Sequence, residues 1–262
     1  MFSDKFKARL AGLALAGAIM SVPGVASAGV VVKSSGPSAG SYPVGRQVAD
    51  SSTITLRSGD RITVLTDSGT KVMQGPGTFR VGEGATRTRA RFSNLTRRNA
   101  SNRSRTGAVR SAGEGAPRRP NLWLVDVTAE GTTCLLDFER VRLWRPTAEA
   151  AQTYTFADQT GATSLDVTFV GTEVMRALDP AGLTLADGMS YTITGPIAPP
   201  AEGEEPGEEP AEPAAAPTSI NVTFVSMPAD ISQPAQLAAA LAERGCMSQL
   251  SLLGDVAEAE AR

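Results

Sequence analysis

"ITLRSGDRITVLTDSGTKVMQGPGTFRV", residues 54–81, alternates apolar and polar side chains and contains three turn sequences. Ile54 and Leu56 would share one face of an extended chain, and so would Ile62 and Val64. The turn sequences are Ser58-Gly59-Asp60, Asp67-Ser68-Gly69 and Gly75-Pro76-Gly77. Alternation with a period of two residues, interrupted by glycine, is typical of short antiparallel strands. Residues 29–84 are therefore predicted to form a small antiparallel β meander unit, whose thin core would have to dock on something else.

The first 28 residues have the pattern of a secretory signal peptide. They contain, in order, a basic start, an apolar run and a small-x-small cleavage sequence: Lys5, Lys7 and Arg9; Leu10 to Val22; Ala26-Ser27-Ala28. We expect cleavage before Gly29 and export to the periplasm or the extracellular space. An uncleaved amino-terminal anchor is the alternative. No later segment of the sequence is apolar enough to span a membrane.

Cys134 and Cys246 are the only cysteines, and export would place them in an oxidising compartment. We therefore predict a disulfide between them, with two buried thiols as the alternative. The bond would close a loop of 112 positions. Loop-closure entropy gives an upper limit of about 4–5 kcal/mol for the resulting stabilisation.

The chain contains no histidine. This absence excludes Ser-His-Asp and Cys-His catalysis and every zinc site that uses histidine. Two cysteines are too few for a cysteine-rich metal site, so we expect neither a metal nor a cofactor. Catalysis by carboxylates, lysines or serines alone stays possible, but no recognisable catalytic motif is present. We expect a protein that is not an enzyme.

The charge is divided unevenly between the two halves of the chain. Residues 29–120 carry 16 Lys or Arg against 5 Asp or Glu, and residues 121–262 carry 6 against 21. Residues 85–120 alone contain ten arginines and one acid, Glu114. We read 85–120 as an Arg-rich segment, with a possible helix in its first part and a linker after it.

Seven of these arginines are the candidate contacts for an anionic partner: Arg87, Arg89, Arg91, Arg97, Arg98, Arg103 and Arg105. Guanidinium groups bind phosphate and carboxylate oxygens bidentately. The expected partner is an envelope protein or an anionic glycan or lipid headgroup. Nucleic acid is not expected, because aromatic residues are almost absent between the arginines. The alternative is a solvated linker that pairs with the acidic half of the same chain.

Residues 121–253 predict a larger β-sandwich-like domain, because strand-like segments recur there between Gly and Asp turns. Within it, residues 195–217 hold seven prolines and six glutamates and predict a disordered acidic loop in an expanded hairpin. A C-terminal helix is expected over residues 233–245, ending at Gly245. Residues 254–262 are expected to be a frayed tail. The fold class is mainly β.

Two further groups of side chains were weighed as functional candidates. Trp123 and Trp144 could form a sugar-stacking platform, although alternation within strands favours core positions for both. Four acids could supply a carboxylate pair for glycoside hydrolysis: Asp126, Glu130, Asp137 and Glu139. Nothing in the sequence fixes the separation of these acids, and turn or surface roles are favoured for them.

Residues 42–81 resemble the FecR-type extracytoplasmic β domain, which repeats strands, Gly-Asp turns and a closing Gly-x-Phe-like element. The matching residues are Gly45, Leu56, Gly59-Asp60, Ile62, Val64, Gly69-Thr70 and Gly75-Pro76-Gly77-Thr78-Phe79. The resemblance implies a periplasmic, non-catalytic module that binds proteins or envelope polymers. We expect a cleavable signal here in place of the family's cytoplasmic segment and membrane span, and we assign the larger C-terminal domain to no family.

These observations together predict an exported binding, assembly or sensing module of the cell envelope. The competing function is that of a carboxylate-dependent enzyme acting on polysaccharide. The sequence leaves the oligomeric state open.

Overall fold

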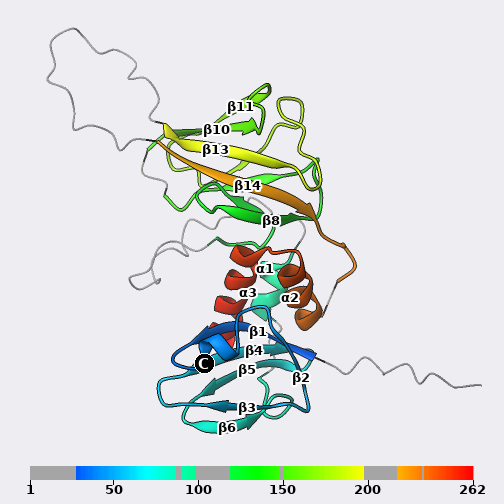
Figure 1. The fold of residues 1–262 in the computed structure, drawn as a ribbon. Coiled ribbons are helices and arrows are strands. Elements are labelled where there is room, and N and C mark those ends of the chain that lie inside the picture. Colours follow the sequence, from blue (N-terminus) through cyan, green and yellow to red (C-terminus); the bar gives the residue numbers. More distant parts are fainter. Residues whose placement is uncertain are drawn as a thin grey trace, which may run out of the picture.

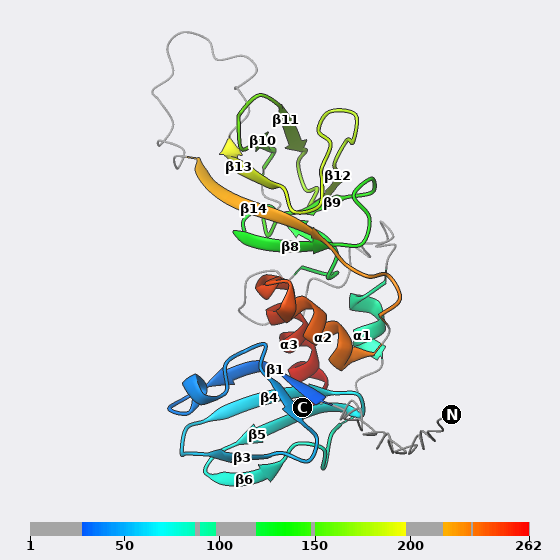
Figure 2. The ribbon, with the colours of Figure 1, turned by 45° about the vertical axis from the view of Figure 1, so that its right-hand side comes forward.

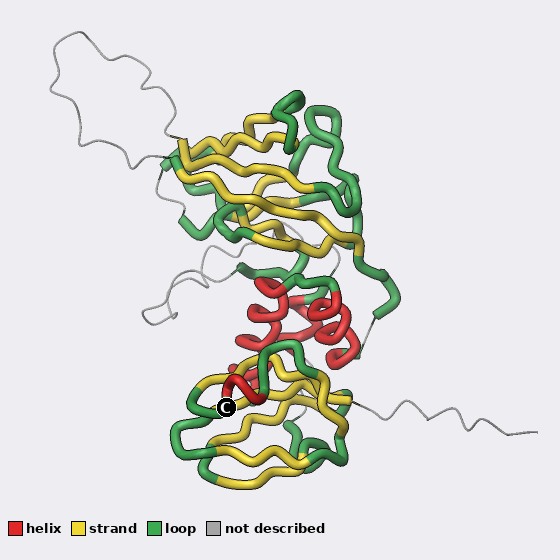
Figure 3. Tube along the Cα trace, in the orientation of Figure 1, coloured by secondary structure: helices red, strands yellow, loops and turns green. Residues whose placement is uncertain are grey.

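The computed structural model describes residues 28–86, 90–97, 119–147, 150–197, 217–231 and 233–261. These residues form a mainly β protein, as the sequence predicted. A small β unit, a layer of helices and a larger β-sandwich follow one another along the long axis (Figure 1). The helices lie between the two β units (Figure 3).

The small unit contains two antiparallel sheets. Its strands are β1 (Ala28–Ser35), β2 (Gln47–Ala49), β3 (Thr53–Leu56), β4 (Arg61–Thr66), β5 (Gly69–Gln74) and β6 (Gly77–Arg80), and η1 (Ala39–Ser41) is a short 3-10 turn. The larger sheet has the order β2-β1-β4-β5, and β3 pairs with β6. Ile54, Leu56, Ile62 and Val64 are buried together in the core of this unit, as the alternation predicted.

Asp60 explains why the β3–β4 turn requires the residues found there. Its carboxylate is buried and accepts hydrogen bonds from the backbone N–H groups of Ser38, at 2.7 Å, and Arg57. Gly36 has a positive φ of 99°, and a Cβ on it would lie 2.5 Å from the carbonyl oxygen of Gly59. One acid and one glycine therefore tie the segment after β1 to this turn.

The sandwich packs a five-stranded sheet on a three-stranded sheet. The first has the order β11-β10-β13-β14-β8, with β8 (Gly131–Leu135), β10 (Gln152–Asp158), β11 (Ser164–Phe169), β13 (Ser190–Ile197) and β14 (Thr218–Ser226). The second has the order β12-β9-β7, with β7 (Leu124–Asp126), β9 (Arg142–Trp144) and β12 (Met175–Ala177). β13 and β14 pair antiparallel up to Gly195 and Thr218, so they flank the predicted acidic loop as a hairpin.

Three helices supply the layer between the β units: α1 (Ala90–Leu95), α2 (Pro234–Glu243) and α3 (Met247–Glu260). Val30, Val32 and Leu65 of the small unit share one apolar core with Leu241 and Leu253 of these helices. The predicted docking surface of the small unit is therefore this chain's own C-terminal segment.

The expected frayed tail at residues 254–262 is wrong. α3 continues to Glu260, and Ala257 and Glu258 are buried. Glu258 is held by ion pairs to Arg61, at 2.6 Å, and Lys33, at 3.3 Å. Gly254 brings the helix close to β1, because a Cβ there would lie 2.8 Å from the carbonyl oxygen of Val32. Two acids of this segment, Asp255 and Glu258, are the partners of cations on the small unit.

The predicted disulfide between Cys134 and Cys246 is confirmed, with 5.8 Å between the two Cα atoms. It joins β8 of the sandwich to the turn between α2 and α3. Both residues are fully buried. The bond therefore fastens the helical layer to the sandwich, while the ion pairs of Glu258 fasten the same layer to the small unit.

Several predictions concern residues outside the described ranges. They include the signal peptide at residues 1–28, apart from Ala28, most of the Arg-rich segment, and residues 198–216 of the acidic loop. In the described part of the chain, no helix is long and apolar enough to cross a membrane.

Candidate functional site

The seven candidate arginines fall mostly outside the described residues. Arg97 is exposed, just after α1, and its carbonyl oxygen accepts a hydrogen bond of 2.9 Å from the Asn121 side chain. The backbone of Arg91 belongs to α1, but its side chain lies outside the description, as do Arg87, Arg89, Arg98, Arg103 and Arg105. The grouping of these seven side chains stays a prediction.

A groove of about 860 Å³ lies against the three-stranded sheet of the sandwich. Val125 and Leu143 face the sandwich core. Leu124 and Arg142 alternate with them and line the groove, so the groove occupies the outer face of this sheet. Its size is in the range of ligand-binding clefts.

Charged side chains surround the apolar floor of this groove. Arg140 pairs with Asp137 at 3.7 Å, and Arg176 pairs with Glu173 at 3.0 Å. The two arginine side chains are 81% and 41% exposed. Exposed ion pairs of this kind contribute about 0–1 kcal/mol, so a ligand carboxylate or phosphate can replace the internal partner at little cost.

A second, smaller pocket of about 280 Å³ adjoins the groove. Trp123, Leu136 and Ala229 line both cavities and form the ridge between them. Phe92 of α1 and Ile231 give the smaller pocket an apolar wall. Ser93 of α1 and Arg97, just after α1, add polar groups to the lining of this pocket.

The position of Trp123 is fixed by its indole N–H, which donates a hydrogen bond of 2.9 Å to the carbonyl oxygen of Thr96. Its side chain is half-buried and separates the two cavities. Trp144 is only 5% exposed and belongs to the interior. The two tryptophans therefore do not form a shared exposed platform for a sugar.

β12 forms an edge of the three-stranded sheet, next to β9 (Figure 2). Four successive residues of this strand and its end line the groove: Met175, Arg176, Ala177 and Leu178. Residues of one face alone would appear at every second position. The groove therefore follows the edge of the strand, where main-chain groups as well as side chains are accessible.

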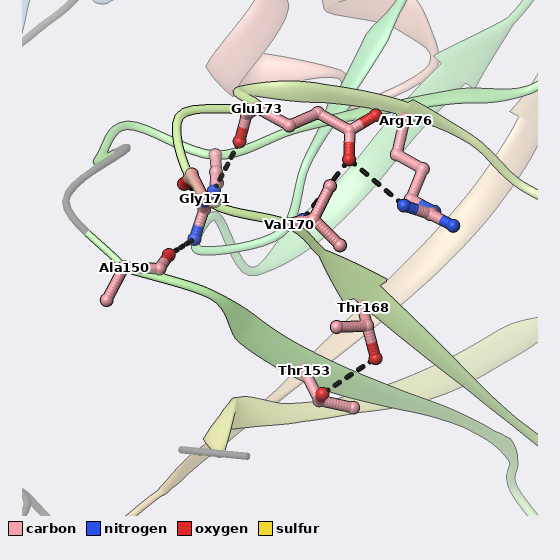
Figure 4. Close-up of polar contacts among 8 residues, drawn as sticks. Ala150, Thr153, Thr168, Val170, Gly171, Glu173 and Arg176 are labelled. Carbon is pink, nitrogen blue, oxygen red and sulfur yellow. Dashed lines mark hydrogen bonds and ion pairs between the residues drawn. The ribbon is translucent and has the colours of Figure 1, made fainter. Parts of the chain in front are cut away.

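The loop that leads into β12 is held by Arg145, which is fully buried. Its guanidinium donates hydrogen bonds to the carbonyl oxygens of Gly171 and Glu173, both at 2.7 Å, and of Ala150, at 2.8 Å. Figure 4 shows these carbonyl groups converging, with the Glu173 carboxylate directed toward Arg176 and the N–H of Val170. Burial lowers the pKa of the Arg145 guanidinium, and the carbonyl oxygens compensate its charge.

The candidate carboxylates take part in turns rather than in an acid pair. Asp126 accepts hydrogen bonds from the N–H and hydroxyl of Thr128. Asp137 accepts one of 2.8 Å from the N–H of Glu139, although both residues line the groove. Glu130 is exposed. Within the described ranges, no group of three or more His, Cys, Asp or Glu side chains is arranged to hold a metal ion.

The sequence analysis missed the groove, the smaller pocket and β12. Arg140, Arg142 and Arg176 are separated along the chain, and no dense basic run marks them. A weak signal was available in Met175-Arg176-Ala177, where apolar and charged side chains alternate over three residues. Three residues are too few for periodicity to separate a strand from a loop.

No protein-family model, curated protein or solved structure matches this chain. The resemblance of residues 42–81 to the FecR-type domain thus stays a prediction from those residues.

Proposed function

We propose that this protein is a non-catalytic binding module of the cell envelope, exported to the periplasm or the extracellular space. The observation that carries the proposal is the pair of adjoining cavities, in which exposed arginines surround an apolar floor. The disulfide between Cys134 and Cys246 supports the location, because such bonds persist in oxidising compartments. The FecR-type resemblance implies the same kind of module.

The partner is an envelope protein or an anionic glycan or lipid headgroup. Arg140 and Arg176 offer their guanidinium groups to carboxylate or phosphate oxygens, and Leu124 and Trp123 offer apolar contact area. Arg97 lines the smaller pocket, and it is one of the seven candidate arginines. The other six add positive charge on both sides of it in the sequence, within residues 87–105. Because the ion pairs of Arg140 and Arg176 are weak, a ligand can replace the acid in either pair without refolding of the protein.

Two forms of the purified protein test this function. In the first, Arg140→Gln and Arg176→Gln are combined; in the second, the seven arginines are changed to glutamine. Arg80→Gln is the matched control, because Arg80 is likewise exposed and pairs with an acid three residues away, Glu83. Immobilised protein is offered vesicles containing anionic phosphatidylglycerol, polygalacturonate, and the protein fraction of an envelope extract.

We expect the wild-type protein to retain one of these three probes in a salt-sensitive manner and the groove variant to lose it, while Arg80→Gln keeps it. Loss in the seven-arginine variant as well would extend the site to the Arg-rich segment. Retention by the groove variant would contradict the groove as the contact surface. Failure of the wild-type protein to retain any probe, together with release of sugars from polygalacturonate, would favour a polysaccharide-acting enzyme instead.

A further inference from the structure

The open edge of β12 carries peptide groups that point away from the rest of the sheet. Two hydrogen bonds lie just beyond the ends of the β9–β12 pair. The N–H of Arg145 donates to the carbonyl oxygen of Val174, and the N–H of Leu178 donates to the carbonyl oxygen of Val141. These bonds fix which residue pairs of the ladder are hydrogen-bonded and which are not. With this alternation, Arg176 is the residue that exchanges hydrogen bonds with β9. The N–H and C=O groups of Met175 and Ala177 therefore point away from β9, toward the open side of the sheet.

Unpaired main-chain groups along a strand are the chemistry that recognises another extended polypeptide. A glycan or lipid headgroup offers no matching row of alternating donors and acceptors. A platform of two tryptophans for sugar rings is absent, because Trp144 is buried. The edge of β12 consequently favours a peptide over the other partners that the proposed function allows.

The smaller pocket adjoins the groove near Trp123, just before β7, so a peptide paired with β12 enters it by continuing along the groove past the end of the sheet. It is reached across the ridge of Trp123, Leu136 and Ala229, which the groove shares. Its volume of about 280 Å³ exceeds that of a single large apolar side chain, and Phe92 and Ile231 give it an apolar wall. An aromatic or large aliphatic residue is the side chain that this pocket fits.

The charges along the groove favour an acidic residue next to that anchor. Arg140 and Arg176 are both accessible, and their own acids hold them only weakly. A carboxylate on the peptide can replace Asp137 or Glu173 as the partner of either guanidinium. A basic residue would gain less at Glu173, because this carboxylate also accepts a hydrogen bond from the N–H of Val170.

From these features we infer that the groove binds an extended peptide segment of a partner protein, which adds a strand to the open edge of β12. The peptide inserts an aromatic or large aliphatic side chain beside Phe92 and Trp123 and places an acidic residue against Arg140 or Arg176. The inference rests on the proposed function and narrows its partner to a protein.

The test begins with a random peptide library selected against the purified wild-type protein, followed by fluorescence anisotropy on the enriched sequences. Ala177→Pro removes the N–H that faces the groove and leaves the Arg176 ladder position intact, and proline is tolerated on edge strands. Ala229→Trp fills the ridge between the cavities. Ser164→Pro is the matched control, because Ser164 begins the edge strand β11 at the far side of the other sheet.

We expect enriched peptides to combine an apolar anchor with an acid and to lose about tenfold in affinity with Ala177→Pro or Ala229→Trp, but not with Ser164→Pro. Methylating alternate peptide nitrogens provides a second measurement on the unaltered protein. One of the two methylation registers should abolish binding and the other should not.

Peptides that bind Ala177→Pro as tightly as wild type, or that tolerate both methylation registers, would overturn the inference. A selection that enriches no peptide would also overturn it. If the wild-type protein then still retains vesicles or polygalacturonate through Arg140 and Arg176, the proposed function stands without the peptide. If nothing is retained, both fail.

Discussion

Gln249 of α3 pairs with the main chain of Cys134 as a neighbouring strand would. Its side-chain oxygen accepts the N–H of Cys134 at 2.7 Å, and its side-chain nitrogen donates to the carbonyl oxygen of Cys134 at 2.8 Å. The same nitrogen donates to the carbonyl oxygen of Leu122 at 2.9 Å. Gln249 is fully buried, so one side chain closes the edge of β8 where the helical layer meets the sandwich.

Replacing Gln249 with leucine should destabilise the protein by about 3 kcal/mol, because three buried main-chain groups would lose their partners. Urea unfolding followed by circular dichroism measures this loss. Ser251→Ala, at an exposed position of the same helix, is the control and should change the free energy of unfolding by less than about 0.5 kcal/mol. Equal stability of the leucine variant and wild type would show that the hydrogen bonds of Gln249 contribute nothing.

Removing the disulfide with the double change Cys134→Ser and Cys246→Ser should lower the free energy of unfolding by at most about 4–5 kcal/mol. The bond closes a loop of 112 residues, so its loss enlarges the conformational freedom of the unfolded chain. Wild type unfolded in reducing agent should approach the double variant. If reduction leaves the urea midpoint unchanged, the loop-closure account is wrong.

The Asp60 turn should make the small unit sensitive to acid. Burial opposes the charge of Asp60, but the hydrogen bonds from Ser38 and Arg57 hold the pKa of this carboxyl below its ordinary value of 3.8. A lowered pKa stabilises the fold above the ordinary value, and this contribution disappears as the pH falls through the folded-state pKa.

Wild type should therefore lose stability below about pH 4. Asp60→Asn should be less stable at neutral pH and should lack this part of the acid dependence. The exposed Asp230→Asn is the control. Parallel pH profiles for wild type and Asp60→Asn, measured by thermal unfolding, would refute the role of Asp60.

Lys33 should produce the opposite dependence at high pH. Its hydrogen bond of 2.6 Å to Asp255 raises its pKa above the ordinary value of 10.5, although burial acts in the other direction. A raised lysine pKa stabilises the fold fully below the ordinary value and ceases to do so as the pH rises through the folded-state pKa. Stability should fall above pH 10.5 in wild type.

Lys33→Gln should remove that part of the fall. Lys71→Gln should retain it, because Lys71 is the only other lysine beyond residue 28 and contacts main-chain carbonyls of Arg80 and Glu83 instead of an acid. Urea unfolding at several alkaline pH values gives the comparison. An unchanged slope in Lys33→Gln would assign the alkaline loss to other groups.

Arg145→Met should destabilise the sandwich by about 3 kcal/mol, because the carbonyl oxygens of Ala150, Gly171 and Glu173 would lose a shared donor. The loss should be local, so hydrogen exchange should accelerate most in residues 170–178. Exchange that accelerates evenly through both sheets would argue that Arg145 acts on the whole core and not on the loop before β12.

The periodic parts of the fold were predictable from the sequence. Ile54, Leu56, Ile62 and Val64 alternate strictly, and alternation reports burial on one face of a strand. The pairing of Cys134 with Cys246 was predictable because no other cysteine was available. The flanks of the acidic loop read as strands, and they pair as a hairpin.

The remaining features depend on contacts that no local pattern reports. Residues 254–262 were expected to fray, because nothing in the local sequence reports that Lys33 and Arg61, far away in the chain, pair with Glu258. Arg145 is buried among carbonyl oxygens of two loops, although arginine is a typical surface residue. The groove requires the side-by-side placement of β9 and β12, which lie about 30 residues apart.

The sharing of one core by β1 and α3 has a consequence for how the chain is made. Lys33 and Asp255 are 222 positions apart, so a ribosome finishes the partner of the first strand among the last segments it produces. The face of β1 that packs on α3 therefore stays uncovered until that segment has been made. A cut or a premature stop just after β14 would therefore uncover the face of β1 that α3 covers, and it would also remove Cys246 and Gln249 from their contacts with β8 of the sandwich.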